Sequence, residues 1–276
     1  MEYILQTDGL SKKYKKTQAL DGLCMHVPKG AIYGFIGKNG AGKTTLIRMI
    51  CGLSKPTSGN YTLYGIQNTD KEIEQIRKHM GAVVETPALT LDMTAEENLR
   101  QQYRIIGLSS FDGINDLLKL VGLENTGKKK VKAFSLGMKQ RLGIAMALVG
   151  EPDFLVLDEP TNGLDPQGII ELRELILKLN HEKGITFLIS SHILDELARI
   201  ATHYGIIDRG KMIKEFSAQE LEKESETHIH IKVESSEAGS LLKVLKENDI
   251  VYEIVSEKEK VLEEYFISLI GGEGNA

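Results

Sequence analysis

Residues 37–44 read GKNGAGKT and combine the residue types that hold phosphate groups. The glycines allow backbone N–H groups to curl around phosphate oxygens without obstruction from side chains. Lys43 can reach the β- and γ-phosphates of a nucleoside triphosphate, and the hydroxyl of Thr44 can bind Mg²⁺. The residues expected to contact nucleotide in and beside this loop are Gly37, Asn39, Gly40, Gly42, Lys43, Thr44 and Thr45.

An acidic pair ends the segment FLVLDE, residues 154–159, which otherwise reads as a buried strand. Asp158 is placed to hold Mg²⁺ through its water shell. Glu159 is placed to polarise an attacking water as a general base. Apolar strands followed by an acid are common by chance. The phosphate loop upstream and Pro160 directly afterwards favour the hydrolytic interpretation.

The segments around these motifs predict an α/β fold. Residues 31–36 form a compact apolar run that is typical of a buried strand, and helical spacing follows over residues 44–51. Strand patterns at 154–157 and 185–189 enclose a helical pattern at 168–179. Strands that alternate with helices favour a mainly parallel sheet with helices on its faces.

Two other regions have a different character. Short strand patterns occupy the first third of the chain, at 3–7 and 20–27. Residues 87–149 are mostly helical in pattern, and Thr94 followed by Glu97 predicts a capping box at a helix N-terminus.

From residue 217 to residue 276 the pattern changes to short elements preceded by dense Glu and Lys. It predicts a small α+β appendage built from a strand at 228–233, a helix at 238–246, a strand at 250–255 and a helix at 258–270. We therefore divide the chain into a main domain, residues 1–216, and this appendage.

Composition and charge exclude several classes of protein. The chain has 276 residues and a formal net charge of −5, which argues against a nucleic-acid partner because such partners require a basic face. Its two cysteines form no CxxC pair, which fits a reducing cytosol. No apolar run approaches the roughly 20 residues needed to span a bilayer, so we expect a soluble protein.

Two segments carry a specific resemblance to the ABC ATPases. FSLGMKQR at 134–141 precedes DEPTNGLD at 158–165, and this order resembles the ABC signature, Walker B and D-loop motifs. The resemblance extends from Gly9 to Gly210. It implies a P-loop NTPase of ABC type with a mainly parallel core sheet, an antiparallel β subdomain and a helical subdomain at about 87–149, to which the α+β appendage is added.

The resemblance also implies how the site is completed. ABC ATPases sandwich two ATP molecules between two subunits packed head to tail, so that the signature of one subunit faces the phosphate loop of the other. Ser135 and the backbone at Gly137 would bind the γ-phosphate across that interface, and Asp165 would contact the opposite subunit. Leu136 and Met138 depart from the common LSGGQ signature, but the serine and one glycine are kept.

Three further residues acquire roles from the family pattern. Tyr14 matches the aromatic residue that stacks on adenine, and His192 matches the switch histidine that contacts the γ-phosphate. Glu85 stands where the family usually has a glutamine that ligates Mg²⁺ and senses the membrane partner. Glutamate at this place resembles the ATPases of bacitracin-resistance and lantibiotic-immunity exporters. We expect Glu85 to bind the metal and to support hydrolysis.

The resulting prediction is an ATP- and Mg²⁺-dependent exporter ATPase on the cytoplasmic face of the membrane, beneath a separate permease. It would act as an ATP-dependent homodimer or as a heterodimer with a similar ATPase, in the export of, immunity to or resistance against a peptide antibiotic. The alternatives are a non-transport ABC ATPase and an importer ATPase. The exporter is favoured because the chain has one P-loop, no coiled-coil heptad run, and the unusual Glu85 and signature.

Overall fold

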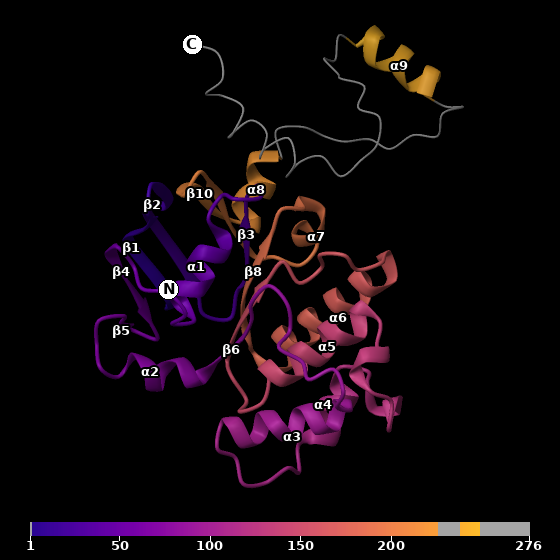
Figure 1. Ribbon diagram of the computed structural model, residues 1–276. Coiled ribbons are helices and arrows are strands. Elements are labelled where there is room, and N and C mark those ends of the chain that lie inside the picture. The colour runs from indigo at the N-terminus through magenta and orange to yellow at the C-terminus, as the bar shows by residue number, and fades with distance from the viewer. Residues whose placement is uncertain (1, 226–237, 249–276) are drawn as a thin grey trace.

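The computed structural model describes residues 2–225 and 238–248. Within these ranges the chain forms two sheets and a group of helices (Figure 1). The helix predicted at 238–246 is present as α9, Ala238–Glu247. The other elements predicted for the appendage, at 228–233, 250–255 and 258–270, lie outside the described residues, so the boundary near residue 216 stays a prediction.

The central sheet has six strands in the spatial order β10-β9-β3-β8-β7-β6. They are β3 (Ile32–Ile36), β6 (Met80–Val83), β7 (Phe154–Asp158), β8 (Thr186–Ser191), β9 (His203–Asp208) and β10 (Lys211–Ser217). β3 runs parallel to β8 and β9, and β7 runs parallel to β6 and β8, whereas β10 is antiparallel to β9. The prediction of a mainly parallel core sheet is therefore confirmed.

Three inner strands of the central sheet, β3, β7 and β8, are buried on both faces. Successive side chains of a strand point to opposite faces, and β3 divides its side chains between two apolar cores. Ile32 and Ile36 pack into the core beneath the helices, while Tyr33 and Phe35 pack into the core beneath the second sheet. Burial on both sides explains why these strands read as continuous apolar runs in the sequence.

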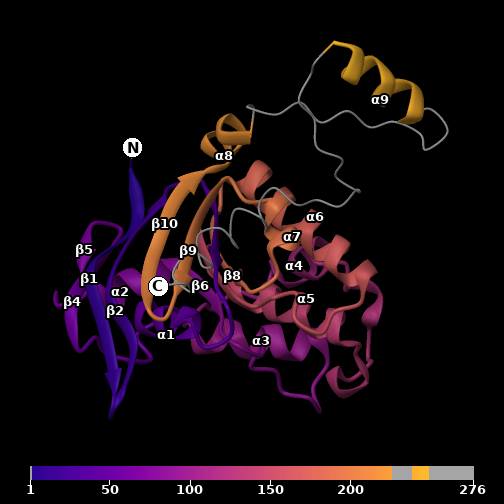
Figure 2. The same cartoon turned by 90° about the horizontal axis from the view of Figure 1, so that it is seen from above.

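The second sheet has the order β2-β1-β4-β5 and lies on the side of the central sheet away from most of the helices (Figure 2). Its strands are β1 (Tyr3–Tyr14), β2 (Thr17–Pro28), β4 (Ser58–Leu63) and β5 (Ile66–Gln67). The pairings of β1 with β2 and β4 are antiparallel, which confirms the antiparallel β subdomain. The sequence pattern ended β1 too early, at residue 7, because register shifts in the β1–β2 pairing break the alternation of apolar and polar residues.

Among the described residues, six helices contribute to the core on the other side of the central sheet, namely α3 (Ala95–Ile105), α4 (Ile114–Leu120), α5 (Leu136–Ala147), α6 (Pro166–Lys183), α7 (Leu194–Ala198) and α8 (Ala218–Ser225) (Figure 1). Two others, α1 (Lys43–Ile50) and α2 (Ile73–Ile76), pack into the core beneath the second sheet. The predicted capping box of α3 is present: Thr94 Oγ1 accepts from the Glu97 N–H at 3.2 Å, and Glu97 Oε2 accepts from the Thr94 N–H at 2.6 Å. Within the described part of the chain, no helix combines the length and hydropathy that crossing a bilayer requires.

Sequence analysis missed three strands of the central sheet, namely β6, β9 and β10. β6 has only four residues, too few for a pattern to distinguish a strand from a loop. Its place in the sheet is set by tertiary packing against β7 and α5. A Cβ on Gly81 would lie 2.1 Å from the Ala147 carbonyl oxygen at the end of α5, so the two elements touch through their backbones.

Gly81→Ala is expected to lower the free energy of unfolding by about 1–3 kcal/mol, because β6 or the end of α5 must move to admit the methyl group. Chemical denaturation followed by circular dichroism measures the change in the free energy of unfolding. The matched control is Ala82→Ser on the same strand, since Ala82 is exposed. Equal stability of the two variants would contradict the close approach of β6 to α5.

Candidate active site

The phosphate-binding loop joins β3 to α1 and is packed against two other strands. A Cβ on Gly37 would lie 2.5 Å from the Ile207 carbonyl oxygen of β9, and one on Gly42 would lie 2.6 Å from the Ala19 carbonyl oxygen of β2. Gly40 has open space around it but a φ of 81°, which side chains rarely adopt. Gly37 and Gly42 are thus required by packing, and Gly40 by backbone conformation.

Lys43 begins α1 and is 5% exposed. Its ammonium group donates to the Gly37 carbonyl at 2.5 Å and to the Lys38 carbonyl at 3.3 Å, and forms an ion pair with Glu159 Oε1 at 3.0 Å. Thr44 and Thr45 follow in the first turn of α1 and are partly buried. The structure therefore places the lysine of the loop directly against the proposed general base.

Glu159 lies just beyond the C-terminal end of β7, between two partners. Its Oε1 contacts Lys43, and its Oε2 lies 2.6 Å from His192 Nδ1. The backbone φ of Glu159 is 49°, a conformation that costs free energy for a residue other than glycine. The Glu159 N–H donates to Ser190 Oγ at 2.9 Å, which helps to hold this conformation.

Asp158 is 1% exposed, and its two carboxylate oxygens differ. Oδ1 accepts a hydrogen bond from Ser190 Oγ at 2.6 Å, whereas Oδ2 is buried without a hydrogen-bond partner among the described residues. A buried carboxylate oxygen without a partner is costly. The residues here therefore fit a divalent cation and its water shell, with Asp158 and the Thr44 hydroxyl as the holding groups.

Ser190 was missed as a site residue by sequence analysis. It ends the apolar run of β8 and contacts both members of the acidic pair, through the carboxylate of Asp158 and the N–H of Glu159. The sequence contains a signal that could have identified it. Two serines end a buried parallel strand, and parallel sheets bind ligands at the carboxyl ends of their strands. Their partners could not be named without the β7–β8 register.

Comparison with known proteins assigns this arrangement to a family. The model of the family described as ABC transporter matches residues 20–162, which is more than half of the chain. The chain belongs to the ABC transporter family. It is an ATP-binding and ATP-hydrolysing member, and the prediction made from the signature, Walker B and D-loop motifs is confirmed.

Relatives of this ABC ATPase include ATP-binding proteins named for the transport of bacitracin and of lantibiotics. It is 41% identical to the bacitracin transport ATP-binding protein BcrA of Bacillus licheniformis, over 99% of each chain. It is 43% identical to the lantibiotic transport ATP-binding protein SrtF of Streptococcus pyogenes, over 79% of this chain and 93% of that one. Among solved structures, a dimeric ATP-binding cassette bound to ADP and Pi in a post-hydrolysis state matches with a TM-score of 0.68 and 27% identity, over 78% of this chain and 98% of that one.

The ABC signature lies at the start of α5. Ser135 is the N-cap of this helix, and its hydroxyl accepts from the Met138 N–H at 3.2 Å, while Gly137 lies in the first turn. Among residues 2–225 and 238–248, no hydrogen bond or ion pair links residues 134–141 to the phosphate-binding loop. Contact of Ser135 and Gly137 with nucleotide across a subunit interface stays a prediction.

Two other predicted site residues, Tyr14 and Asp165, are exposed. Tyr14 ends β1, is 44% exposed and has the Lys12 ammonium group 5.0 Å from its ring centroid. Its stacking on adenine stays a prediction. Asp165 is exposed and caps α6 by accepting from the Gly168 N–H at 2.9 Å. This local role does not exclude the predicted contact with a second subunit.

Glu85 is paired with an arginine rather than with the acidic pair in this structure. It has a φ of 60° and forms an ion pair with Arg48 of α1, with 2.6 Å between Oε1 and Nη2. Among the described residues, no hydrogen bond or ion pair joins Glu85 to Thr44, Asp158 or Glu159. Arg48 was not singled out from the sequence, since an arginine on an amphipathic helix is ordinarily a solvated residue.

Proposed function

We propose that this ABC ATPase drives an exporter of peptide antibiotics from the cytoplasmic face of the membrane, through a separate permease. The proposal is carried by the similarity along 99% of the chain to a protein named for bacitracin transport. The lantibiotic transport relative supports the same class of substrate. The chain thereby protects its cell against the antibiotic, as an immunity or resistance protein.

ATP binding begins with an exchange of partners at Lys43. The ammonium group that holds Glu159 in the structure turns to the β- and γ-phosphates, which carry more negative charge. Glu159 is then free to accept the proton of the attacking water, while His192 Nδ1 keeps the carboxylate oriented. Asp158 and the Thr44 hydroxyl would hold a magnesium ion, which would supply positive charge to the phosphate oxygens.

Two copies complete each other's sites in this proposal. Ser135 and Gly137 at the N-terminus of α5 supply N–H groups and a hydroxyl to the γ-phosphate held by the other copy. A similar solved cassette is dimeric, which supports the pairing of two copies. Closure around ATP and reopening after hydrolysis are the motions that the permease uses.

Cells that make the protein test the proposed function directly. Replacing the chain with its Glu159→Gln variant is expected to increase their sensitivity to bacitracin or to a lantibiotic such as nisin. The matched control carries Glu174→Gln, an exposed residue on α6. Unchanged sensitivity to both antibiotics would contradict the exporter proposal, and co-sedimentation of the chain with ribosomes instead of membranes would favour a non-transport ATPase.

Glu85→Ala is expected to lower ATP hydrolysis and transport by roughly tenfold, equivalent to about 1.4 kcal/mol of lost transition-state stabilisation. The reason is that the carboxylate leaves Arg48 when nucleotide binds and helps to hold the metal. Hydrolysis by the complex with permease measures the effect. Thr86→Ala, an exposed neighbour, is the control. If Glu85→Ala leaves hydrolysis and transport unchanged, Glu85 has no role in the site.

A further inference from the structure

We propose that Glu196 is a positioning residue for ATP hydrolysis, which holds His192 against Glu159 by binding the hydroxyl of Thr161. The proposal rests on the roles assigned above to Glu159 and His192, and it concerns the ATPase reaction alone. It adds a hydrogen bond between the D-loop, which contains Thr161, and α7, which follows His192 in the same chain. We call this bond, between Thr161 Oγ1 and Glu196 Oε2, the latch.

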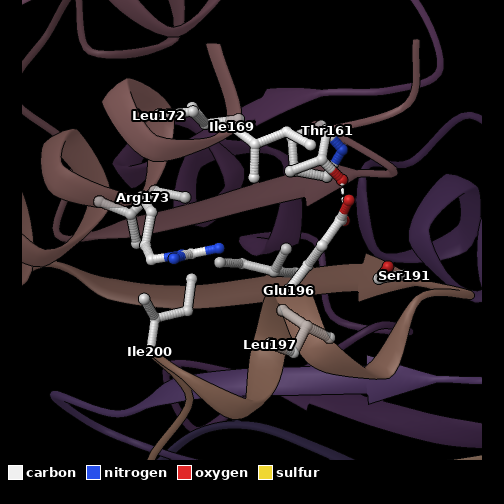
Figure 3. Close-up of a pocket in the computed structure, with 11 residues that line it drawn as sticks. Thr161, Ile169, Leu172, Arg173, Ser191, Glu196, Leu197 and Ile200 are labelled. Carbon is white, nitrogen blue, oxygen red and sulfur yellow. Dashed lines mark hydrogen bonds between the residues drawn. The ribbon is translucent and has the colours of Figure 1, made fainter. Parts of the chain in front are cut away.

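The latch joins the same two segments that the contact between His192 and Glu159 joins. Thr161 follows Glu159 by two residues in the loop between β7 and α6, and Glu196 follows His192 by four residues on α7. The Thr161 hydroxyl donates to Glu196 Oε2, while His192 Nδ1 contacts Glu159 Oε2 at 2.6 Å. Figure 3 shows the Glu196 carboxylate and the Thr161 side chain directed toward each other. Two bonds therefore fix one segment on the other.

The surroundings of Glu196 are mostly apolar, which makes a carboxylate there unexpected. The pocket that it lines includes Ile169 and Leu172 of α6, Ile189 of β8 and Leu197 of α7 (Figure 3). Burial raises the pKa of Glu196 above its ordinary value, although the Thr161 hydrogen bond opposes the rise. Burying a carboxylate costs more free energy than burying an apolar side chain of similar size, so packing alone does not account for Glu196.

Arg173 of α6 supplies a positive charge to the same pocket. Its guanidinium group is directed into the pocket (Figure 3), and its Nε atom is buried without a hydrogen-bond partner among the described residues. The positive charge favours the ionised form of Glu196. An ionised carboxylate accepts a stronger hydrogen bond from Thr161 than a neutral acid would.

The latch matters because α7 is too short to hold its own position. It has five residues, Leu194–Ala198, and isolated helices of that length are unstable in water. Its placement depends on the buried Leu194 and Leu197 and on the latch. Without the latch, α7 and the preceding His192 can shift relative to Glu159. The phosphate-binding loop belongs to other elements, so ATP binding is unaffected.

Steady-state ATP hydrolysis by the purified chain tests the latch with four variants. Thr161→Val removes the hydroxyl at nearly constant volume, and Glu196→Leu fills the apolar pocket without an acceptor. Each is expected to lower kcat by roughly 10- to 100-fold, as misplacement of catalytic groups does, with KM for ATP nearly unchanged. Thr161→Ser keeps the hydroxyl and is expected to restore kcat. Asp195→Asn, exposed on α7, is the matched control.

The double variant Thr161→Val/Glu196→Leu distinguishes a shared bond from two separate roles. Because both changes break the same contact, its kcat is expected to equal that of the single variants. Full kcat in Thr161→Val or in Glu196→Leu would overturn the proposal, and so would losses that multiply in the double variant. Glu159→Gln measured alongside reports on the catalytic base itself, so that an error in that assignment is recognised separately.

Discussion

Glu159→Gln is expected to lower ATP hydrolysis by roughly 10²- to 10⁴-fold, the contribution typical of a general base, while ATP still binds. Glutamine keeps the size and hydrogen-bonding reach of the side chain but cannot accept the proton of the attacking water. It also removes a negative charge that competes with the phosphates for Lys43, which lies 3.0 Å away. We therefore expect the affinity for ATP to be unchanged or higher.

Phosphate release and ATP binding, measured on the same preparation, separate these two effects. Glu174→Gln on α6 is again the control, because this carboxylate is exposed. Substantial hydrolysis by Glu159→Gln would show that another group activates the water. Loss of ATP binding would show instead that the carboxylate holds the phosphate-binding loop together.

Lys43→Ala is expected to lower the affinity for ATP by roughly 100-fold, because the variant loses charge-assisted hydrogen bonds to two phosphates. Lys43 is nearly buried and its ammonium group is held by two loop carbonyls, so it is already in place for the phosphates. Its removal also leaves the Glu159 carboxylate without this cation. Hydrolysis should fall for both reasons.

Equilibrium titration with a fluorescent ATP analogue measures the change in affinity. Lys38→Ala is a matched control, because Lys38 belongs to the same loop, its side chain is exposed and its carbonyl, the part that Lys43 contacts, is kept. Near-normal ATP affinity in Lys43→Ala would contradict the assignment of the loop. Equal losses in the two variants would indicate a general effect of positive charge.

Local patterns were sufficient to predict the parts of the fold that are continuous in sequence. The strand before the phosphate loop, the helix after it and the capping box of α3 each depend on neighbouring residues. β6 and β9 were missed because their parallel partners, β7 and β3, lie far away in the chain. β10 was missed together with β9, with which it pairs directly across a two-residue turn. β6, for example, pairs with β7, more than seventy positions later.

In the candidate site, too, the residues within local motifs could be predicted and their distant partners could not. Lys43, Asp158 and Glu159 could be named from motifs, because phosphate chemistry requires these residue types at those spacings. The partners that orient them could not be named. Ser190 reaches Asp158 only because β7 and β8 are adjacent and in register. The Thr161–Glu196 bond joins the loop after β7 to α7 after β8, and their meeting depends on the same pairing. Arg48 beside Glu85 belongs to no motif.

The central claim is that ATP is bound between two copies of this chain, and the mass of the Glu159→Gln variant in solution tests it most directly. Light scattering during gel filtration with Mg²⁺ and ATP is predicted to give about twice the 30.6 kDa mass of one chain, and with ADP the mass of one chain. Adding Ser135→Arg at the start of α5 is predicted to prevent the ATP-dependent dimer while ATP still binds. A single-chain mass at saturating ATP, or a dimer that Ser135→Arg leaves intact, would contradict the account.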